Sequence, residues 1–302
     1  MINRQFSLDA WVLYFEQAQL PVLRRTQEEL PRLEEREDAL NGQELAAVIL
    51  RDPIMTVKVL RYLQEHRGKR QITDITTISR AVMMIGTTPF FKAFASQPII
   101  EEHLDEYPQA REGAMRVMSR AYHASLYALD WAVQHHDMDT DEVVVAALLR
   151  DLAEMLLWCF APEPMLAIRE KMRLNPALRS AAAQQEILGF RIIELQLALI
   201  QAWQLPGLLQ SLMDEAHADH PRTKCVALAT ALARHSANGW NDAALPDDFA
   251  GIADFLKKSP DDTWDRIRHT VLLAAKGWEW YGVPPAAAWL PMQAATLQEK
   301  SI

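Results

Sequence analysis

The sequence predicts an almost wholly α-helical protein. Only ten glycines occur among 302 residues. Apolar residues recur at helical spacing in nearly every segment, and no segment keeps the two-residue alternation of a half-buried strand. Half of the residues are hydrophobic and 24% are charged, which is the balance of an ordinary globular chain. At this length we expect about two domains or subdomains.

Helix-stopping residues delimit the first elements. A helix from Leu8 to Gln19 is stopped by Pro21, and a charged helix from about Arg24 to Asp38 is broken by Asn41-Gly42. Three further helices are expected at 43–50, 54–65 and 76–85. Gly86 ends the last of them, since glycine is the usual residue after a helix.

Asp52-Pro53 marks the start of the helix that ends near Glu65. Asp is a favoured N-cap, and Pro is a favoured first helical residue. We expect four apolar residues of this helix to belong to the core of an amino-terminal subdomain. They are Ile54, Val57, Leu60 and Leu63.

The middle of the chain is predicted to hold its longest helices. Residues 108–136 form one helix, with an apolar stripe that includes Met115, Met118 and Tyr122. A turn at 137–141 separates it from a second helix at 142–160, which is apolar nearly all round. A helix without a polar face is typical of a buried position, so we expect 142–160 to be the central helix.

Further helices are expected at 165–174, 181–188, 192–203, 208–216 and 223–237. The stretch 238–251 carries Pro, Asp and Gly and predicts a boundary. The chain then divides into an amino-terminal helical subdomain (1–105), a second helical subdomain (106–238) and a Trp-rich helical extension (239–302). We expect 246–289 to be ordered and docked. Its aromatic side chains either close the core or form a partner surface. They are Trp264, Trp278, Trp280, Tyr281 and Trp289.

The net charge and the cysteines limit the possible binding partners and the cellular compartment. The net charge of −9 repels phosphate backbones, so a nucleic-acid contact would need a local basic patch. Cys159 and Cys225 lie in apolar helical stretches, where a thiol behaves as a small hydrophobe. No export signal precedes them, and no apolar run approaches the roughly 18 residues that cross a bilayer. We therefore expect a cytoplasmic protein without a membrane partner.

One dense basic cluster stands out, ending a helix and continuing beyond it. Its members are Lys58, Arg61, Arg67, Lys69 and Arg70. The cluster is either a solvated helix end or a contact for phosphate or nucleic acid. No aromatic residues are interleaved with the charges, which argues against nucleic acid.

Common catalytic motifs are missing from the sequence. It contains neither GxxxxGK[ST] nor GxGxxG, so the usual phosphate-cradling loops are absent. It also lacks GxSxG, CxxC and HExxH, which removes the common acyl-transfer and zinc enzymes. No cofactor is expected.

Four segments carry a resemblance to a known family. They read RDPIMTVKVLRYLQ (51–64), ITTISRAVMMIG (75–86), AALLRDLAEMLL (146–157) and EILGFRIIELQLALIQAWQLP (186–206). In this order they resemble the HDOD family, the HD-related output domains of bacterial signalling proteins. The resemblance covers roughly 20–238. It implies a multi-helix, HD-like fold, with the HDOD part of the amino-terminal subdomain beginning near residue 20.

The resemblance also implies a degenerate metal site. Catalytic HD phosphohydrolases, which are similar to this family, hold a metal with a histidine, a His-Asp pair and a later aspartate. Here His123 matches the first position and Asp151 is retained. Arg150 replaces the paired histidine, and two further expected ligand positions read Ile192 and Thr230.

The substitution at Arg150 has a chemical consequence, because a guanidinium is always charged and only donates hydrogen bonds. It repels a cation. Arg150 is therefore expected to pair with Asp151 or another nearby acid, either as a structural ion pair or as part of a site for an anionic ligand. His123 alone is more typical of a hydrogen-bonded core residue than of a metal ligand.

These observations favour a non-enzymatic regulatory module. It is expected to act through contacts with an unidentified signalling protein or by binding a small anionic ligand at His123, Arg150 and Asp151, and self-association stays open. The alternative is a divergent metal-dependent phosphohydrolase acting on a nucleotide or cyclic dinucleotide, which would use His123 and Asp151.

Overall fold

The described residues are built from helices alone. The computed structural model describes residues 6–66, 77–137, 139–175, 177–205, 210–211 and 220–291. Within these ranges the chain forms α-helices and short 3-10 helices without a β-strand, and a single bridge joins Val22 to Ile99. None of these helices is long and apolar enough to cross a membrane. The all-α prediction is confirmed.

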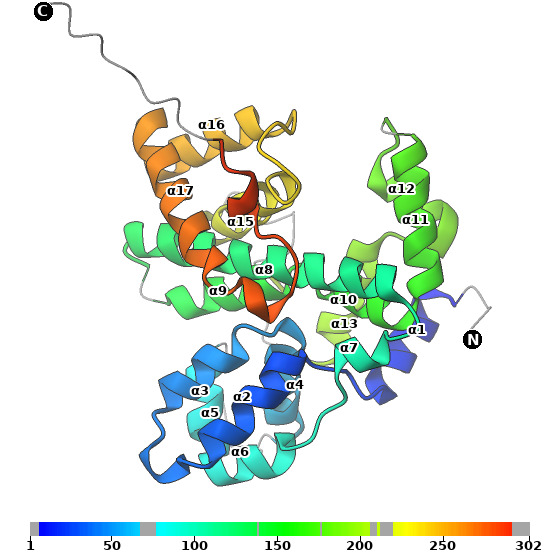
Figure 1. Ribbon diagram of the computed structural model, residues 1–302, viewed down its shortest axis with the longest axis vertical. Coiled ribbons are helices and arrows are strands. Elements are labelled where there is room, and N and C mark those ends of the chain that lie inside the picture. The colour runs from blue at the N-terminus through cyan, green and yellow to red at the C-terminus, as the bar shows by residue number, and fades with distance from the viewer. Residues whose placement is uncertain are drawn as a thin grey trace, which may run out of the picture.

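The amino-terminal helices form one layer below the middle of the molecule (Figure 1). They are α2 (Arg24–Glu34), α3 (Gly42–Ile49), α4 (Pro53–Glu65), α5 (Ile78–Ile85), α6 (Thr87–Phe94) and α7 (Ile100–His103), with the 3-10 turn η1 (Glu37–Ala39) after α2. The first helix, α1 (Leu8–Gln17), leaves this layer and packs on α13 (Ile192–Ala202). The predicted helix 24–38 is therefore an α-helix followed by a separate turn, and α6 and α7 were not predicted.

Asp52 ties this layer together. Its Oδ1 accepts hydrogen bonds from the N–H groups of Ile54 and Met55, both at 3.0 Å, and thereby caps α4. Its Oδ2 accepts from the N–H of Leu23 and the hydroxyl of Thr26, both at 2.7 Å. A fully buried carboxylate thus joins the start of α4 to the start of α2. The predicted beginning of α4 is confirmed.

The predicted core of α4 is also confirmed. The exposed fraction of Leu60 is only 1%, and its three companions in the predicted set are buried as well. They pack with residues of α2, α3 and α5 in one continuous hydrophobic core.

The long helix α8 (Pro108–Gln134) runs through the centre of the molecule and contacts helices on every side (Figure 1). The helix predicted at 142–160 is wrong as a single element. It is divided into α9 (Thr140–Leu149) and α10 (Leu152–Phe160), both almost wholly buried. Asp151 leaves the helical conformation, with φ −108° and ψ 25°. The break places Arg150 and Asp151 between two helices.

The amide of Gln196 on α13 bridges this break. Its Nε2 donates to the carbonyl of Leu149 at 2.8 Å, and its Oε1 accepts from the N–H of Ala153 at 2.7 Å. One buried side chain therefore satisfies a backbone group at the end of α9 and another at the start of α10. This partner lies more than 40 residues away in the sequence, which explains why the local pattern showed a continuous helix.

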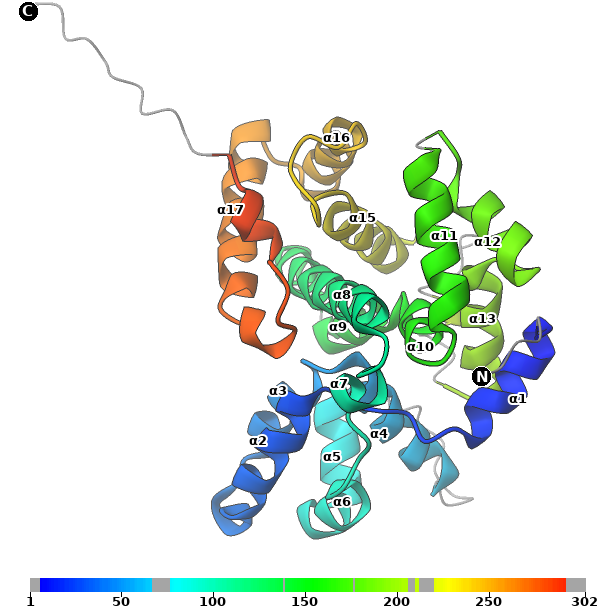
Figure 2. The same ribbon diagram turned by 45° about the vertical axis from the view of Figure 1, so that its right-hand side comes forward.

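Two groups of helices rise on opposite sides of α8 (Figure 2). One consists of α10, α11 (Pro162–Leu174), α12 (Ser180–Leu188) and α13. The other consists of α15 (Pro221–His235), α16 (Leu245–Leu256) and α17 (Pro260–Ala275), followed by the 3-10 turns η3 (Trp278–Trp280) and η4 (Ala286–Trp289). The helix predicted at 208–216 lies almost entirely outside the described residues.

The carboxy-terminal extension packs against the rest of the chain, as expected. Arg266 of α17 makes two hydrogen bonds to the carboxylate of Asp130 on α8, at 2.8 and 3.0 Å. The hydroxyl of Tyr281 donates to the carbonyl of Arg51 at 2.7 Å, and the guanidinium of Arg51 lies over the ring of Trp280. The boundary stretch 238–251 is only partly a loop, because α16 begins at Leu245.

The aromatic residues of the extension divide into buried and exposed members. Tyr281 is buried, and Trp264 makes edge contacts with Trp240 and Phe249. Trp278 and Trp289, by contrast, expose 49% and 46% of their surface. The three-part division of the chain stays a prediction, since α8 touches helices of all three parts.

Candidate functional site

The two groups of helices enclose a pocket of about 660 Å³ above α8. Its walls come from α8, the α9–α10 break, α10, α11, α12, α13, α15 and the segment 283–286. Six arginines line it, namely Arg116, Arg120, Arg150, Arg169, Arg191 and Arg234. Among the described residues, the acidic members of the lining are Asp151 and Glu154. His123 lines the same pocket, so the three site residues predicted from the sequence are brought together here.

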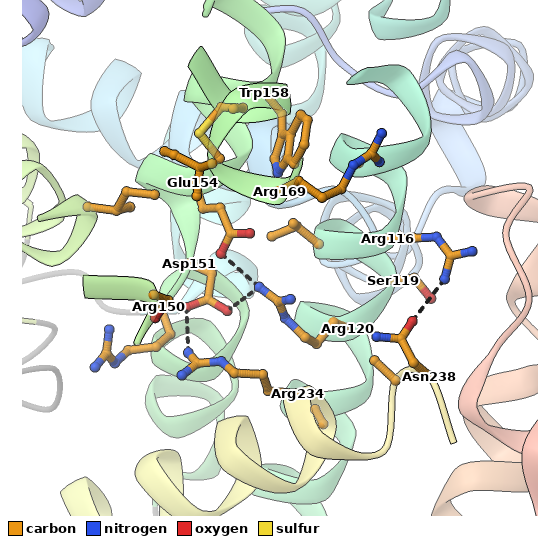
Figure 3. Close-up of a pocket in the computed structure, with 18 of the residues that line it drawn as sticks. Arg116, Ser119, Arg120, Arg150, Asp151, Glu154, Trp158, Arg169, Arg234 and Asn238 are labelled. Carbon is orange, nitrogen blue, oxygen red and sulfur yellow. Dashed lines mark hydrogen bonds and ion pairs between the residues drawn. The ribbon is translucent and has the colours of Figure 1, made fainter. Parts of the chain in front are cut away.

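Arg120 on α8 occupies the space between the two acids (Figure 3). Its Nη2 donates to Asp151 Oδ2 at 3.0 Å and to Glu154 Oε2 at 2.8 Å. Arg234 on α15 also reaches Asp151, with Nη2 at 3.4 Å from Oδ1. The side chains of Arg120 and Asp151 are only 15% and 11% exposed, whereas that of Arg234 is 50% exposed. The pair at the centre is thus nearly buried.

The electrostatics of the cluster follow from this burial. Burial alone would raise the pKa of Asp151, but the charges of Arg120, Arg234 and Arg150 outweigh it and lower the pKa. Burial alone would lower the pKa of Arg120, yet Glu154 and Asp151 outweigh it and raise the pKa. Asp151 and Arg120 therefore stay ionised as partners.

Arg150 was expected to pair with Asp151 or another nearby acid. The hydrogen bonds described for Asp151 come from Arg120 and Arg234. In Figure 3 the guanidinium of Arg150 points away from Asp151. Its charge contributes to the low pKa of Asp151 after the other two arginines.

His123 is a buried, hydrogen-bonded residue, with 4% of its surface exposed. Its Nδ1 lies 2.8 Å from the carbonyl of Ser119, and a carbonyl only accepts, so Nδ1 carries the proton. Burial lowers the pKa of the imidazole. Nε2 is then a buried hydrogen-bond acceptor that has no partner among the described residues. Two buried donors, Arg120 Nε and Trp158 Nε1, also have no partner among these residues. Three polar atoms of the pocket wall are thus unsatisfied.

The residues present do not fit a divalent metal ion. Nε2 of His123 is a suitable donor, but the carboxylates of Asp151 and Glu154 already hold a guanidinium. Ile192 is 9% exposed and has an apolar side chain, and the hydroxyl of Thr230 donates within its own helix. Within the described part of the chain, no three His, Cys, Asp or Glu side chains are grouped as a metal site.

Both described members of the basic cluster have structural contacts. Lys58 Nζ donates to the carbonyl of Leu20 at 2.7 Å, and burial lowers the pKa of this amine to about 8. Arg61 lies over the ring of Trp203 at 4.3 Å and donates to the carbonyl of Glu16. These contacts join α4 to the end of α1, to the segment after it and to the end of α13. The other members, Arg67, Lys69 and Arg70, lie outside the described residues.

Sequence reasoning missed Arg120, Glu154 and Arg234, although a signal for them exists. Arg120 precedes His123 by three residues on α8, and Arg234 follows Thr230 by four on α15. Residues three or four apart lie on the same face of a helix. Each missed arginine is therefore one turn from a position that the resemblance had already assigned to the site.

Trp158 forms part of the pocket wall and depends on a glycine. Its ring packs so closely on α8 that a Cβ at Gly113 would lie 2.8 Å from three ring carbons. We expect Gly113→Ala to lower the free energy of unfolding by about 1–3 kcal/mol, since an indole in a packed wall moves only at a cost. Urea unfolding measures this.

Gly42→Ala is the control for that change. A Cβ at Gly42 would meet nothing closer than 4.0 Å, at the start of α3. We expect this substitution to be neutral or slightly stabilising, because alanine has the higher helix propensity. Equal unfolding free energies for the two variants would show that Trp158 moves aside freely.

Comparison with known proteins identifies relatives of this arrangement. The HDOD domain matches residues 20–219, about two thirds of the chain. A search of curated proteins found no match.

Two solved structures share the fold. The MmoQ response regulator from Methylococcus capsulatus aligns with a TM-score of 0.60 and 19% identity, over 82% of this chain and 98% of its own. A virulence factor from Campylobacter jejuni aligns with a TM-score of 0.63 and 19% identity, over 92% of this chain and 98% of its own. At such identities the likeness concerns the fold.

Proposed function

Because the chain belongs to the HDOD family, we propose that it is a non-enzymatic signalling module whose central pocket binds a small anionic ligand. The observation that carries the proposal is the guanidinium of Arg120 between Asp151 and Glu154. A metal-dependent hydrolase needs those carboxylates for an ion that holds and activates water. Here an internal cation uses them, and a second cation beside it would be repelled.

Other features support a signalling role. One structural relative is named a response regulator. Trp278, Trp289 and Leu272 are each exposed by nearly half, which favours a contact with an unidentified protein partner or a second copy of the chain. Cys159 and Cys225 are buried free thiols, which supports a cytoplasmic location.

The alternative is a divergent phosphohydrolase. It is favoured by one observation, namely that His123 and Asp151 line the same pocket. Elemental analysis of the purified protein distinguishes the two functions, together with phosphodiesterase and nucleotide phosphatase assays in Mn²⁺, Mg²⁺ and Ni²⁺. We expect neither stoichiometric metal nor turnover above background.

Asp151→Asn is the variant for these assays, because it keeps the shape of the side chain and removes its charge. Circular dichroism confirms that the variant is folded. Under the proposal, this variant and the native chain show the same background rate of phosphodiester and phosphate hydrolysis. Metal-dependent turnover of the native chain that disappears in folded Asp151→Asn would establish the hydrolase instead.

A further inference from the structure

The pocket carries an excess of positive charge in a chain that is negative overall. Its lining holds six arginines and two acids, an excess of four. Glu112 and Glu194 lie outside the lining and pair with Arg116 and Arg191. Including these two acids leaves an excess of two. The net charge of the whole chain is −9, so this concentration of cations is local.

Among the lining residues that the structure describes, the positive charge comes from arginine rather than lysine. The guanidinium is a planar fork that donates two parallel hydrogen bonds, a geometry that fits phosphate and carboxylate oxygens. A phosphate monoester carries nearly two negative charges at neutral pH, which matches the excess in the pocket. Arg234 is held loosely. It is half-exposed, and its contact with Asp151 is 3.4 Å long.

The size and the apolar walls of the pocket favour a ligand that is larger than inorganic phosphate and partly apolar. A volume of about 660 Å³ lies within the roughly 300–1,000 Å³ of pockets for organic ligands. Ile193 and Met172 are partly exposed at one wall, and Pro284 is exposed at another. A small inorganic ion would leave these apolar surfaces wet. The lining thus combines a cationic part with an apolar part.

We propose that the ligand is an organic phosphate of about nucleotide size, with its phosphate on Arg234 and Arg150 and its organic body against the apolar walls. This assignment rests on the proposed anion-binding function. In Figure 3 both arginines lie on the side of Asp151 away from Glu154, and both line the pocket. When the ligand binds, Asp151 Oδ2 keeps its hydrogen bond from Arg120, whereas Arg234 leaves Oδ1 and donates to the phosphate instead.

Isothermal titration of the full-length protein tests this assignment. The probes are AMP, ADP and glucose 6-phosphate, compared with adenosine, inorganic phosphate and citrate. We expect at least one of the organic phosphates to bind about tenfold or more tightly than each of the three comparison compounds. Added salt should weaken this binding, because the contact is partly ionic.

Arg234→Gln should weaken the same binding by about tenfold or more, which corresponds to the loss of one charge-assisted hydrogen bond. The matched control is Arg173→Gln on α11. Arg173 is 67% exposed, pairs with Glu170 and does not line the pocket. It should bind like the native chain. Both variants should keep the native melting temperature within a few degrees, because neither residue is buried.

Several results would overturn the assignment. These are the absence of binding at millimolar concentrations of all three organic phosphates, equal affinity for citrate, and native affinity in Arg234→Gln. Chromatography of the ligand after incubation with the protein and Mn²⁺ tests the non-enzymatic function separately from the assignment of the ligand. Recovery of intact ligand is expected. Conversion of the ligand would refute the non-enzymatic function while leaving the assignment of the ligand in place.

Discussion

Replacing Asp52 by alanine is expected to lower the free energy of unfolding by about 4 kcal/mol. The carboxylate is fully buried and accepts four hydrogen bonds, two on each oxygen. Each bond contributes on the order of 1 kcal/mol, and the four donors would be left without an acceptor in the protein interior. Two of the bonds also cap α4. Asp52→Asn should cost less, because its one oxygen still accepts.

Urea unfolding measures these values, and Asn41→Ala is the matched control. Asn41 is also an N-cap, but it is exposed and accepts a single hydrogen bond, from Gln43. Loss of such a cap typically costs about 1 kcal/mol. If Asp52→Ala were no worse than Asn41→Ala, the joint between α2 and α4 would not depend on this carboxylate.

Replacing Arg120 by methionine is expected to cost about 3–5 kcal/mol near neutral pH. The change leaves Asp151 and Glu154 close together and nearly buried without the cation between them, and breaking a buried pair in this way is strongly destabilising. Arg234 reduces the cost, because it still reaches Asp151. Methionine preserves most of the apolar stem, so the loss is mainly electrostatic.

The loss of unfolding free energy in Arg120→Met is expected to depend on pH, and the direction follows from the pKa of Asp151. In the native chain the pKa of Asp151 is lowered, so its stabilising contribution is present above the unfolded pKa of about 3.9 and is lost as the pH falls through the native pKa. In the variant Asp151 lacks the guanidinium of Arg120, the largest of the charges that lower its pKa, so its pKa rises. Protonation of Asp151 then relieves its repulsion by Glu154. The difference in unfolding free energy should therefore be largest at pH 7–8 and shrink below about pH 5.

Arg116→Met on the same helix is the control. Arg116 is 39% exposed, and it pairs with an exposed glutamate one turn away. Such surface pairs contribute between 0 and about 1 kcal/mol, with little dependence on pH in this range. A pH-independent loss in Arg120→Met would mean that packing, rather than charge, is the main contribution of Arg120.

Local patterns predicted the elements whose boundaries are set locally. Asp52-Pro53 starts α4 and Gly86 ends α5, because the capping atoms belong to the helix ends themselves. The break between α9 and α10 could not be read in this way. It depends on Gln196, whose amide reaches both ends from another helix, and the sequence around Asp151 has no helix-breaking residue to announce it.

The sequence predicted which residues of the candidate site lie together, but not the hydrogen-bond partners of Asp151. The resemblance placed His123, Arg150 and Asp151 together, and all three line one pocket. The partners of Asp151 are separated from it by 31 residues for Arg120 and 83 for Arg234. Helical spacing places both arginines near the site, but the packing of α8 and α15 decides which arginine reaches the carboxylate.

The contact between Tyr281 and Arg51 has a consequence during protein synthesis. The two residues are 230 positions apart, so Arg51 is made long before its partner. At roughly 5–20 residues per second, the nascent amino-terminal layer waits on the order of ten to fifty seconds for this hydroxyl. Until then the carbonyl of Arg51 lacks this hydrogen bond, and its guanidinium lacks the ring of Trp280. The amino-terminal layer therefore depends during that interval on contacts made within the part of the chain already synthesised.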